Sequence, residues 1–115
     1  MAFTRVLAQA TVSDLARSME WYGTLFGRQP DARPMEGLVE WHLGDGFGVQ
    51  VWTDPDRAGR SAIVLEESDL DGLVARLDEA ALELDPPRDV TASRVVQLED
   101  PDGNRIVVSG RFPDA

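Results

Sequence analysis

The chain has 115 residues, and its 21 acidic and 11 basic side chains give it a formal net charge of −10. A hydrophobic share of 43% and a charged share of 28% are typical of one globular domain and exclude a disordered acidic tail. The negative charge disfavours a nucleic-acid partner, and the absence of cysteine excludes disulfides, thiolate nucleophiles and cysteine-built metal sites.

The first half of the chain predicts a strand, a helix and a hairpin in that order. Residues 6–12 form a short run of β type, and the helical period that follows ends at Gly27. A short strand or loop around residues 31–34 leads to a hairpin over residues 38–52, which turns at Gly44-Asp45-Gly46. The apolar positions of the predicted helix are Leu15, Met19, Tyr22 and Phe26.

The second half repeats this pattern. Ser13-Asp14-Leu15 recurs 55 residues later as Ser68-Asp69-Leu70, again between a β-type run, at 62–65, and a helical pattern. A short segment at 89–92 then leads to a hairpin over residues 95–108. The apolar positions of the second helix, which ends before Pro86-Pro87, are Leu70, Leu73, Val74, Leu77 and Ala81.

One β-α-β-β-β unit is therefore written twice, which predicts an α+β fold. We expect a single domain over residues 1–115, with one module at about 1–55, a second at about 60–112 and a linker at 54–59. The helix of each unit covers only one sheet face, so two modules, and two chains in a homodimer, are expected to share their edges. Residues 1–9 lack the patterns of a secretion signal and of a membrane span, which predicts a cytoplasmic protein with no membrane partner.

Three segments resemble the vicinal oxygen chelate superfamily of glyoxalases, extradiol dioxygenases, and fosfomycin- and bleomycin-resistance proteins. They run from Val12 to Tyr22, over Leu25-Phe26-Gly27, and from Glu99 to Ile106. The resemblance implies two modules whose strands form a curled, incompletely closed barrel around a ligand cleft, with the helices outside. It covers both halves of the chain.

The resemblance also implies where a metal ion would bind. Enzymes of this superfamily hold one divalent metal with His, Gln or Glu side chains at four strand positions, which fall here at Leu7, Gln50, Ala62 and Val107. Only Gln50 can act as a ligand, and the chain has a single histidine, His42, so we expect neither a metal ion nor another cofactor. An all-oxygen magnesium or manganese site built from acidic residues stays open as an alternative.

Side-chain alternation in the hairpins predicts what lines the cleft instead. A first hairpin that turns at Asp45-Gly46 pairs Trp41 with Gln50. Val39 then pairs with Trp52, and Gln50 marks this face as the cleft side. The residues expected to line the ligand-binding cleft are Leu7, Gln9, Trp41, Gln50, Trp52, Ala62, Val64, Gln97 and Val107.

The same alternation assigns the remaining hairpin residues. In the second hairpin Gln97 pairs with Val107. In the first, His42 is expected on the outer face beside Glu40, although a one-residue slip in register would turn both inward. The residues expected to face the helices are Phe47, Val49, Val51, Val96, Leu98, Ile106 and Val108.

An apolar, aromatic and amide-bearing lining suits a planar or amphipathic organic ligand, and the acidic surface attracts a cationic one. The resemblance implies a metal-free binding protein of the glyoxalase/bleomycin-resistance type, which sequesters a compound such as an antibiotic. One alternative is a lyase, isomerase or dioxygenase of the same superfamily. Another is a structural dimerisation module with a filled cleft.

Overall fold

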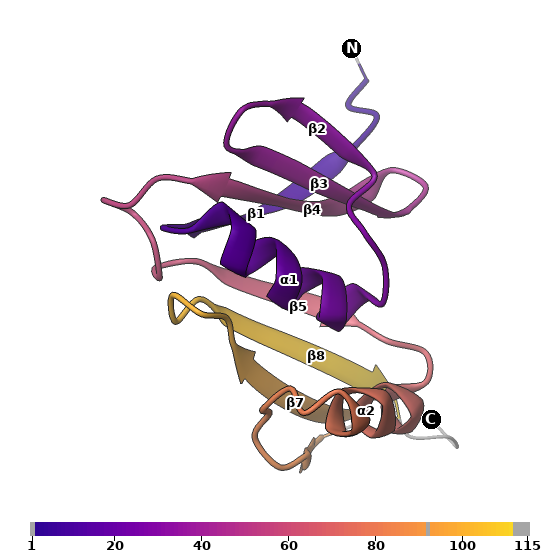
Figure 1. Ribbon diagram of the computed structural model, residues 1–115. Helices are drawn as coiled ribbons and strands as arrows, with labels where there is room; N and C mark the ends of the chain where they lie inside the picture. The colour runs from indigo at the N-terminus through magenta and orange to yellow at the C-terminus, as the bar shows by residue number, and fades with distance from the viewer. Residues whose placement is uncertain (1, 92, 112–115) are drawn as a thin grey trace.

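One β-α-β-β-β unit is repeated along the chain (Figure 1), as the sequence predicts. The computed structural model describes residues 2–91 and 93–111, so Ala92, in the predicted short segment, lies outside the description. The first module contains β1 (Val6–Val12), α1 (Leu15–Phe26), β2 (Ala32–Met35), β3 (Leu38–Gly44) and β4 (Phe47–Thr53). The second module contains β5 (Ala62–Glu66), α2 (Leu70–Glu79), β6 (Arg88–Val90), β7 (Ser93–Glu99) and β8 (Arg105–Arg111).

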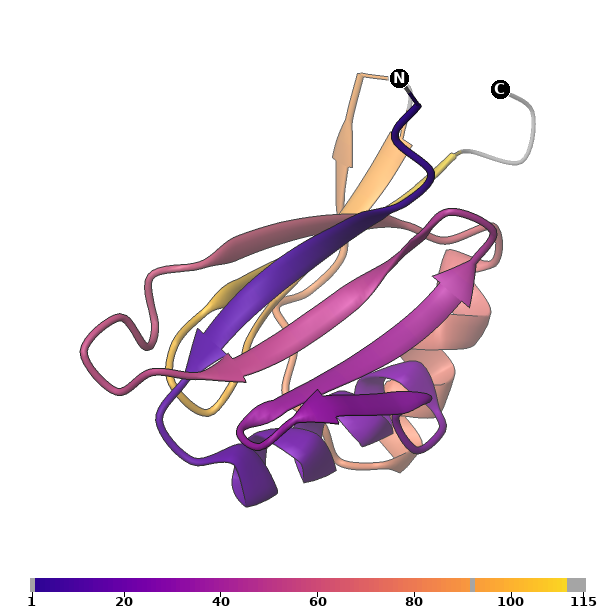
Figure 2. The same cartoon turned by 90° about the horizontal axis from the view of Figure 1, so that it is seen from above.

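Each module folds into a four-stranded sheet. The strand orders are β1-β4-β3-β2 and β5-β8-β7-β6, with β1 parallel to β4 and β5 parallel to β8. Both helices lie on the same side of the two sheets (Figure 2), so the opposite side, which we call the open face, has no helix over it. The sheets meet where β1 approaches β5 and do not close into a barrel, which confirms the predicted α+β fold. In the described part of the chain, neither helix is long and apolar enough to cross a membrane.

The helix side of the first sheet is built around Trp41. Its side chain is fully buried, and its ring lies 6.1 Å from Tyr22 and 5.4 Å from Phe26, both on α1. Aromatic side chains bury more apolar area than any others, so this cluster dominates the core of the module. The prediction that Trp41 lines the ligand cleft is therefore wrong.

A β-bulge explains the error. The hairpin turns at Asp45-Gly46 as predicted, and Gly44 pairs with Phe47. Between His42 and Gly44, however, the register shifts by one residue, so Gln50 pairs with Glu40 instead of Trp41. Because side chains alternate between faces, one extra residue on β3 moves Trp41 to the helix side.

The rest of the shifted register follows. Trp41 pairs with Val49, and Trp52 pairs with Leu38 instead of Val39. Val49 and Val51 are buried under the helix as expected, whereas Phe47 keeps 51% of its surface exposed. The second hairpin has the predicted register, with Gln97 opposite Val107. The four residues predicted for its helix side, all of them buried, are Val96, Leu98, Ile106 and Val108.

The two helices end in the same way on different residues. Gly27 follows α1 with a positive φ of 74°, and the amide of Arg28 bonds back to Gly23. After α2, Ala81 takes a positive φ of 58° and the amide of Leu82 bonds back to Leu77. The second helix therefore ends at Glu79, earlier than the periodicity through Ala81 predicts, because the left-handed residue breaks the helical path.

The β7–β8 turn, residues 100–104, joins the modules. Asp100 is buried, and its carboxylate accepts hydrogen bonds from the Tyr22 hydroxyl at 2.7 Å and from the Asn104 amide at 2.7 Å. The Asn104 side chain also donates to the carbonyl of Thr11, and Asp102 accepts from the backbone amide and hydroxyl of Ser13. Residues of the second module thus satisfy polar groups at the end of β1 and on α1.

Candidate ligand-binding face

Three rows of side chains cross the open face of the first module, each with one residue from β1, β4 and β3. The register places paired residues side by side on this face. The rows are Leu7, Gly48 and His42; Gln9, Gln50 and Glu40; and Thr11, Trp52 and Leu38. Four of the predicted cleft residues, Leu7, Gln9, Gln50 and Trp52, lie on this face as expected.

Hydrogen bonds run through the middle row and on to His42. The Gln9 amide donates to the side-chain oxygen of Gln50 at 3.0 Å, and the Gln50 amide donates to Glu40 Oε2 at 2.6 Å. The other carboxylate oxygen of Glu40, Oε1, lies 2.9 Å from His42 Nε2. We call these four residues the Glu40 network. It fixes the orientation of both glutamine amides.

Glu40 stays charged although only 5% of it is exposed. The hydrogen bonds from His42 and Gln50 lower the pKa of its carboxyl below the usual value, against the opposing effect of burial. The guanidinium of Arg5, 4.0 Å from Glu40 Oε1, lowers it further. The face therefore carries one covered carboxylate that its neighbours hold in the anionic form.

The backbone at His42 is held as firmly as its ring. Its amide donates to Asp31 Oδ2 at 2.7 Å, and its carbonyl accepts a hydrogen bond from the Arg28 side chain. Arg28 and Asp31 are themselves paired at 2.9 Å. The His42 side chain nevertheless remains 39% exposed on the open face.

The sequence predicts that Glu40 and His42 lie on the outer, helix-facing side of the first hairpin, and it assigns no role to Arg5. The register instead places Glu40 and His42 on the open face. A signal for the correct arrangement exists in β3, where apolar Val39 and Trp41 alternate with polar Glu40 and His42. Placing Trp41 in the core requires the polar pair to face the other way.

The second module presents a row of two valines and one glutamine at the corresponding place. Val64 on β5, Val107 on β8 and Gln97 on β7 pair across its open face, and Ala62 lies two residues before Val64. Val64 is 72% exposed. Four predicted cleft residues thus lie on the expected face of the second sheet, but no side-chain hydrogen bond in residues 2–91 and 93–111 joins them to the four on the first sheet.

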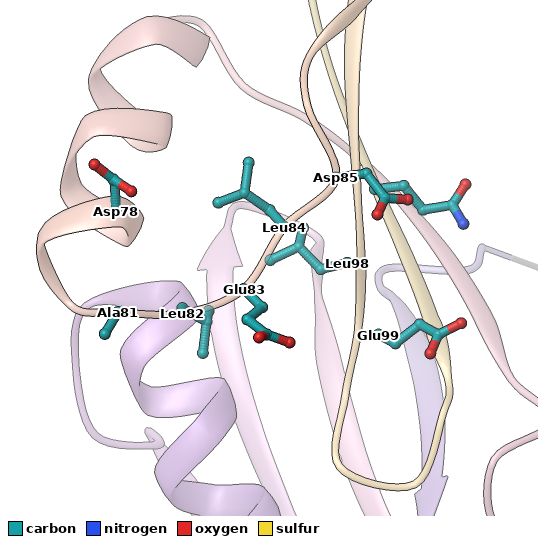
Figure 3. Close-up of a pocket in the computed structure, with 9 residues that line it drawn as sticks. Asp78, Ala81, Leu82, Glu83, Leu84, Asp85, Leu98 and Glu99 are labelled. Atoms are coloured by element: carbon teal, nitrogen blue, oxygen red, sulfur yellow. The ribbon is translucent and has the colours of Figure 1, made fainter.

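Four pockets in the described part of the chain have no lining residue from the three rows of the first module's open face. One of about 590 Å³ lies beside the end of α2 and β7, where Leu84 and Leu98 stand among carboxylates (Figure 3). Gln97 is the one predicted cleft residue that lines it. Its acidic residues are Asp78, Glu83, Asp85 and Glu99. Over the described ranges, no group of three or more His, Cys, Asp or Glu side chains is arranged to hold a metal ion.

The four positions that the resemblance assigns to metal ligands do not fit a metal ion. Leu7, Ala62 and Val107 have aliphatic side chains, which offer no donor atom. Gln50 is the remaining position, and both ends of its amide are engaged, one by Gln9 and one by Glu40. A lone amide oxygen that already accepts a hydrogen bond is a poor ligand.

Comparisons with known proteins agree on one family. The model of the Glyoxalase/Bleomycin resistance protein/Dioxygenase superfamily matches residues 5–108. A glyoxalase/bleomycin resistance protein from Catenulispora acidiphila is 26% identical, with 95% of this chain and 99% of that chain covered and a TM-score of 0.88. TnmS3, an antibiotic-binding protein from a Streptomyces species, is 25% identical, with coverages of 97% and 99% and a TM-score of 0.82.

A bleomycin-binding protein, solved in complex with bleomycin, shares the fold. It is 15% identical, with 94% of this chain and 98% of that chain covered and a TM-score of 0.78. A search of curated proteins found no match.

Proposed function

Because the chain belongs to the Glyoxalase/Bleomycin resistance protein/Dioxygenase superfamily, we propose that it binds and sequesters a small organic molecule on its open face. The observation that carries the proposal is the make-up of this face, where Trp52 and Leu7 stand beside the amides of Gln9 and Gln50. Aromatic and aliphatic surface with a few placed polar groups is the usual lining of a small-molecule site. The likeness to TnmS3 supports an antibiotic or a similar compound as the ligand.

Binding in this proposal uses no metal ion. Support comes from the aliphatic side chains at three of the four family positions and from the engaged amide of Gln50 at the fourth. Elemental analysis of purified protein is expected to find metal far below one ion per chain. Stoichiometric nickel or manganese that survives dialysis against a chelator would contradict this part of the proposal.

A homodimer completes the site. The open face of one chain is a sheet surface, and a second copy laid over it encloses a ligand on both sides. Exposed Val64, at 72% on the open face, supports the second copy, because an apolar side chain this exposed gains stability when covered. Sedimentation at micromolar concentration is expected to give twice the mass of one chain, and a single-chain mass contradicts the dimer.

The ligand is sought with a panel of planar, amphipathic and cationic compounds, read by thermal shift. A compound present at about 100 times its dissociation constant adds about 2.7 kcal/mol to the stability of the folded protein. Affinity for a cationic hit is expected to fall as salt rises, because the net charge of −10 is then screened.

The decisive variant for this proposal is Trp52→Ala. Loss of a contacting aromatic ring is expected to weaken binding of any hit roughly tenfold, which corresponds to about 1.4 kcal/mol. Trp21→Ala is the matched control, because Trp21 lies on α1, on the helix side of the sheet, and is expected to leave the affinity unchanged. Equal affinity in the wild type and the Trp52 variant would place the ligand elsewhere.

A further inference from the structure

We propose that a pocket between the two modules is a second ligand site and that it takes an organic amine with an aromatic or aliphatic body. The pocket has a volume of about 410 Å³, which is within the usual range for small-molecule sites. Its lining comes from both modules and includes none of the three rows on the open face of the first module. The inference therefore goes beyond the proposed function and does not depend on it.

The wall of the pocket is apolar. Phe26 at the end of α1, and Leu43 and Phe47 on β3 and β4, line it from the first module. Leu65 on β5 and Leu73 on α2 line it from the second module. Because two of these five side chains are aromatic, a flat ligand body can pack against rings as well as against aliphatic groups.

Part of this wall is uncovered. Phe47 keeps 51% of its surface exposed, and Val64, which also lines the pocket, keeps 72%. Val6, the neighbour of Phe47 in the β1–β4 ladder, is 70% exposed. Six large hydrophobic side chains are exposed in the described part of the chain, so half of them lie at or beside this pocket. Exposed apolar surface that gathers at a concave site is typical of ligand binding.

The charged groups at the pocket favour a cation. Glu66 and Glu67 line it at the end of β5, and Arg76 lines it from α2. The Arg76 guanidinium is engaged, because it donates to the carbonyls of Thr24 and Leu25 at 2.7 and 2.6 Å. These carbonyls lie in the last turn of α1, where the helix dipole adds partial negative charge. The charge of Arg76 is thus offset by α1, and two carboxylates remain.

These two carboxylates have room for donors. Glu67 accepts at Oε1 from the amide of Asp69 at 3.1 Å. Across residues 2–91 and 93–111, neither its other oxygen nor the exposed carboxylate of Glu66 accepts a hydrogen bond. An ammonium group has three donors and no acceptor, so it suits such a pair, whereas a carboxylate ligand meets two like charges. The net charge of −10 also attracts a cation to the chain.

Tryptamine is the probe for this site, and indolepropionate, which joins a carboxylate to the same indole body, is its matched control. Backbone amide chemical shifts of the full chain are followed by nuclear magnetic resonance while each compound is added. Tryptamine is expected to shift the amides of Phe47, Leu65 and Leu73 in a saturable way. Indolepropionate is expected to bind roughly tenfold more weakly, because its charge is repelled.

Paired substitutions test the two carboxylates. Glu66→Gln together with Glu67→Gln removes both charges and keeps the shape of the side chains, and the Kd of tryptamine is expected to rise roughly fivefold. Glu36→Gln together with Glu79→Gln is the control, because it changes the net charge equally at exposed residues that line none of the four pockets. This control is expected to leave the Kd unchanged. Circular dichroism checks that both variants are folded.

Three results would overturn the proposal. Shifts confined to Gln9, Gln50 and Trp52 would place the amine on the open face, which supports the proposed function and removes the second site. Equal affinity for tryptamine in the wild type and in the Glu66 and Glu67 variant would show that the carboxylates do not recognise it. Shifts at Phe47 and Leu73 that follow protein concentration, without any probe, would show that a second copy of the chain fills the pocket.

Discussion

The two modules are alike on the helix side of their sheets and unlike on the open face. On the helix side, Val49 and Val51 of the first module correspond to Ile106 and Val108 of the second, and all four are buried. On the open face, the hydrogen-bonded row of Gln9, Gln50 and Glu40 corresponds to the row of Val64, Val107 and Gln97.

The difference shows which face the fold constrains. Under the helices each side chain must be apolar and fit its neighbours, so both modules carry the same kind of residue there. The open face has no such packing requirement within one chain, so polar, charged or apolar side chains can occur there. In the row of His42, the first module has Gly48, whereas the second has Arg105 opposite Glu99.

The largest expected effect on stability comes from removing the hydrogen bonds that the β7–β8 turn of the second module makes to the first module. Asp100→Ala leaves the Tyr22 hydroxyl and the Asn104 amide without their acceptor inside the protein. The free energy of unfolding, measured with urea, is expected to fall by about 3 kcal/mol. Asp45→Ala, in the β3–β4 turn, is the control and should leave stability unchanged, because Asp45 is exposed. Equal losses of stability in the two variants would show that the β7–β8 turn contributes no more to stability than the β3–β4 turn.

Tyr22 reports the same contact at alkaline pH. Burial raises the pKa of Tyr22 far above 10.0, and the hydrogen bond to Asp100 and the charge of that carboxylate add to the effect. A raised folded-state pKa means that the full stabilisation is present below pH 10.0 and is lost above it, by up to about 1.4 kcal/mol per pH unit.

Because the chain has one tyrosine, the measurement is direct. Tyrosinate absorbance is expected to appear only as the chain unfolds, and Tyr22→Phe is expected to flatten the alkaline loss of stability. Absorbance that rises while the far-ultraviolet circular dichroism is still native would show that Tyr22 ionises in the folded state.

The helix ends offer a reciprocal pair of substitutions. Gly27 and Ala81 take the same left-handed conformation, which costs a residue with a Cβ about 1–2 kcal/mol. Ala81→Gly is expected to raise the free energy of unfolding by about 0.5–1 kcal/mol, after the greater freedom of glycine in the unfolded chain is subtracted. Gly27→Ala should lower it by a similar amount. Changes of the same sign in the two variants would contradict the shared geometry.

Glu40→Gln is expected to have the smallest effect on stability. The change makes the first module resemble the second, which has Gln97 at the corresponding position. The pKa of Glu40 is lowered in the folded protein, so its stabilisation is present above the ordinary value of 4.5 and is lost as the pH falls through the folded-state pKa. Thermal melts at falling pH are expected to show a shallower loss for the variant. Parallel curves would show that the carboxylate contributes nothing to acid stability.

Most of the fold could be predicted because its signals are local. Repetition of Ser-Asp-Leu before two helical patterns defines the modules, and Gly27 ends the first helix where the sequence places it. The register of the second hairpin follows from alternation on both sides of its turn, and Gln97 does pair with Val107. These features depend on neighbours along the chain.

The site was harder to predict because it depends on the bulge between His42 and Gly44. No residue type marks that position. The shift is favoured because it buries the Trp41 indole against Tyr22 and Phe26, residues on another element. The extra residue turns Trp41 to the helix side and brings Glu40 and His42 to the open face. A register assigned by regular alternation from the turn does not include this shift. The end of α2 was also not predicted. Alanine is the best helix former, so its type gives no sign that Ala81 takes a positive φ and lies beyond the end of the helix.

The hydrogen bond from Asn104 to Thr11 spans 93 positions of the chain. During synthesis, strand β1 and helix α1 leave the ribosome long before the segment that satisfies their remaining polar groups. Loop closure must precede a contact between such distant residues, and proteins dominated by distant contacts fold slowly. We therefore expect the first module to reach its full stability only once the second is present. A nascent chain stalled on the ribosome before residue 104 is expected to be cut by a protease more readily than the released protein.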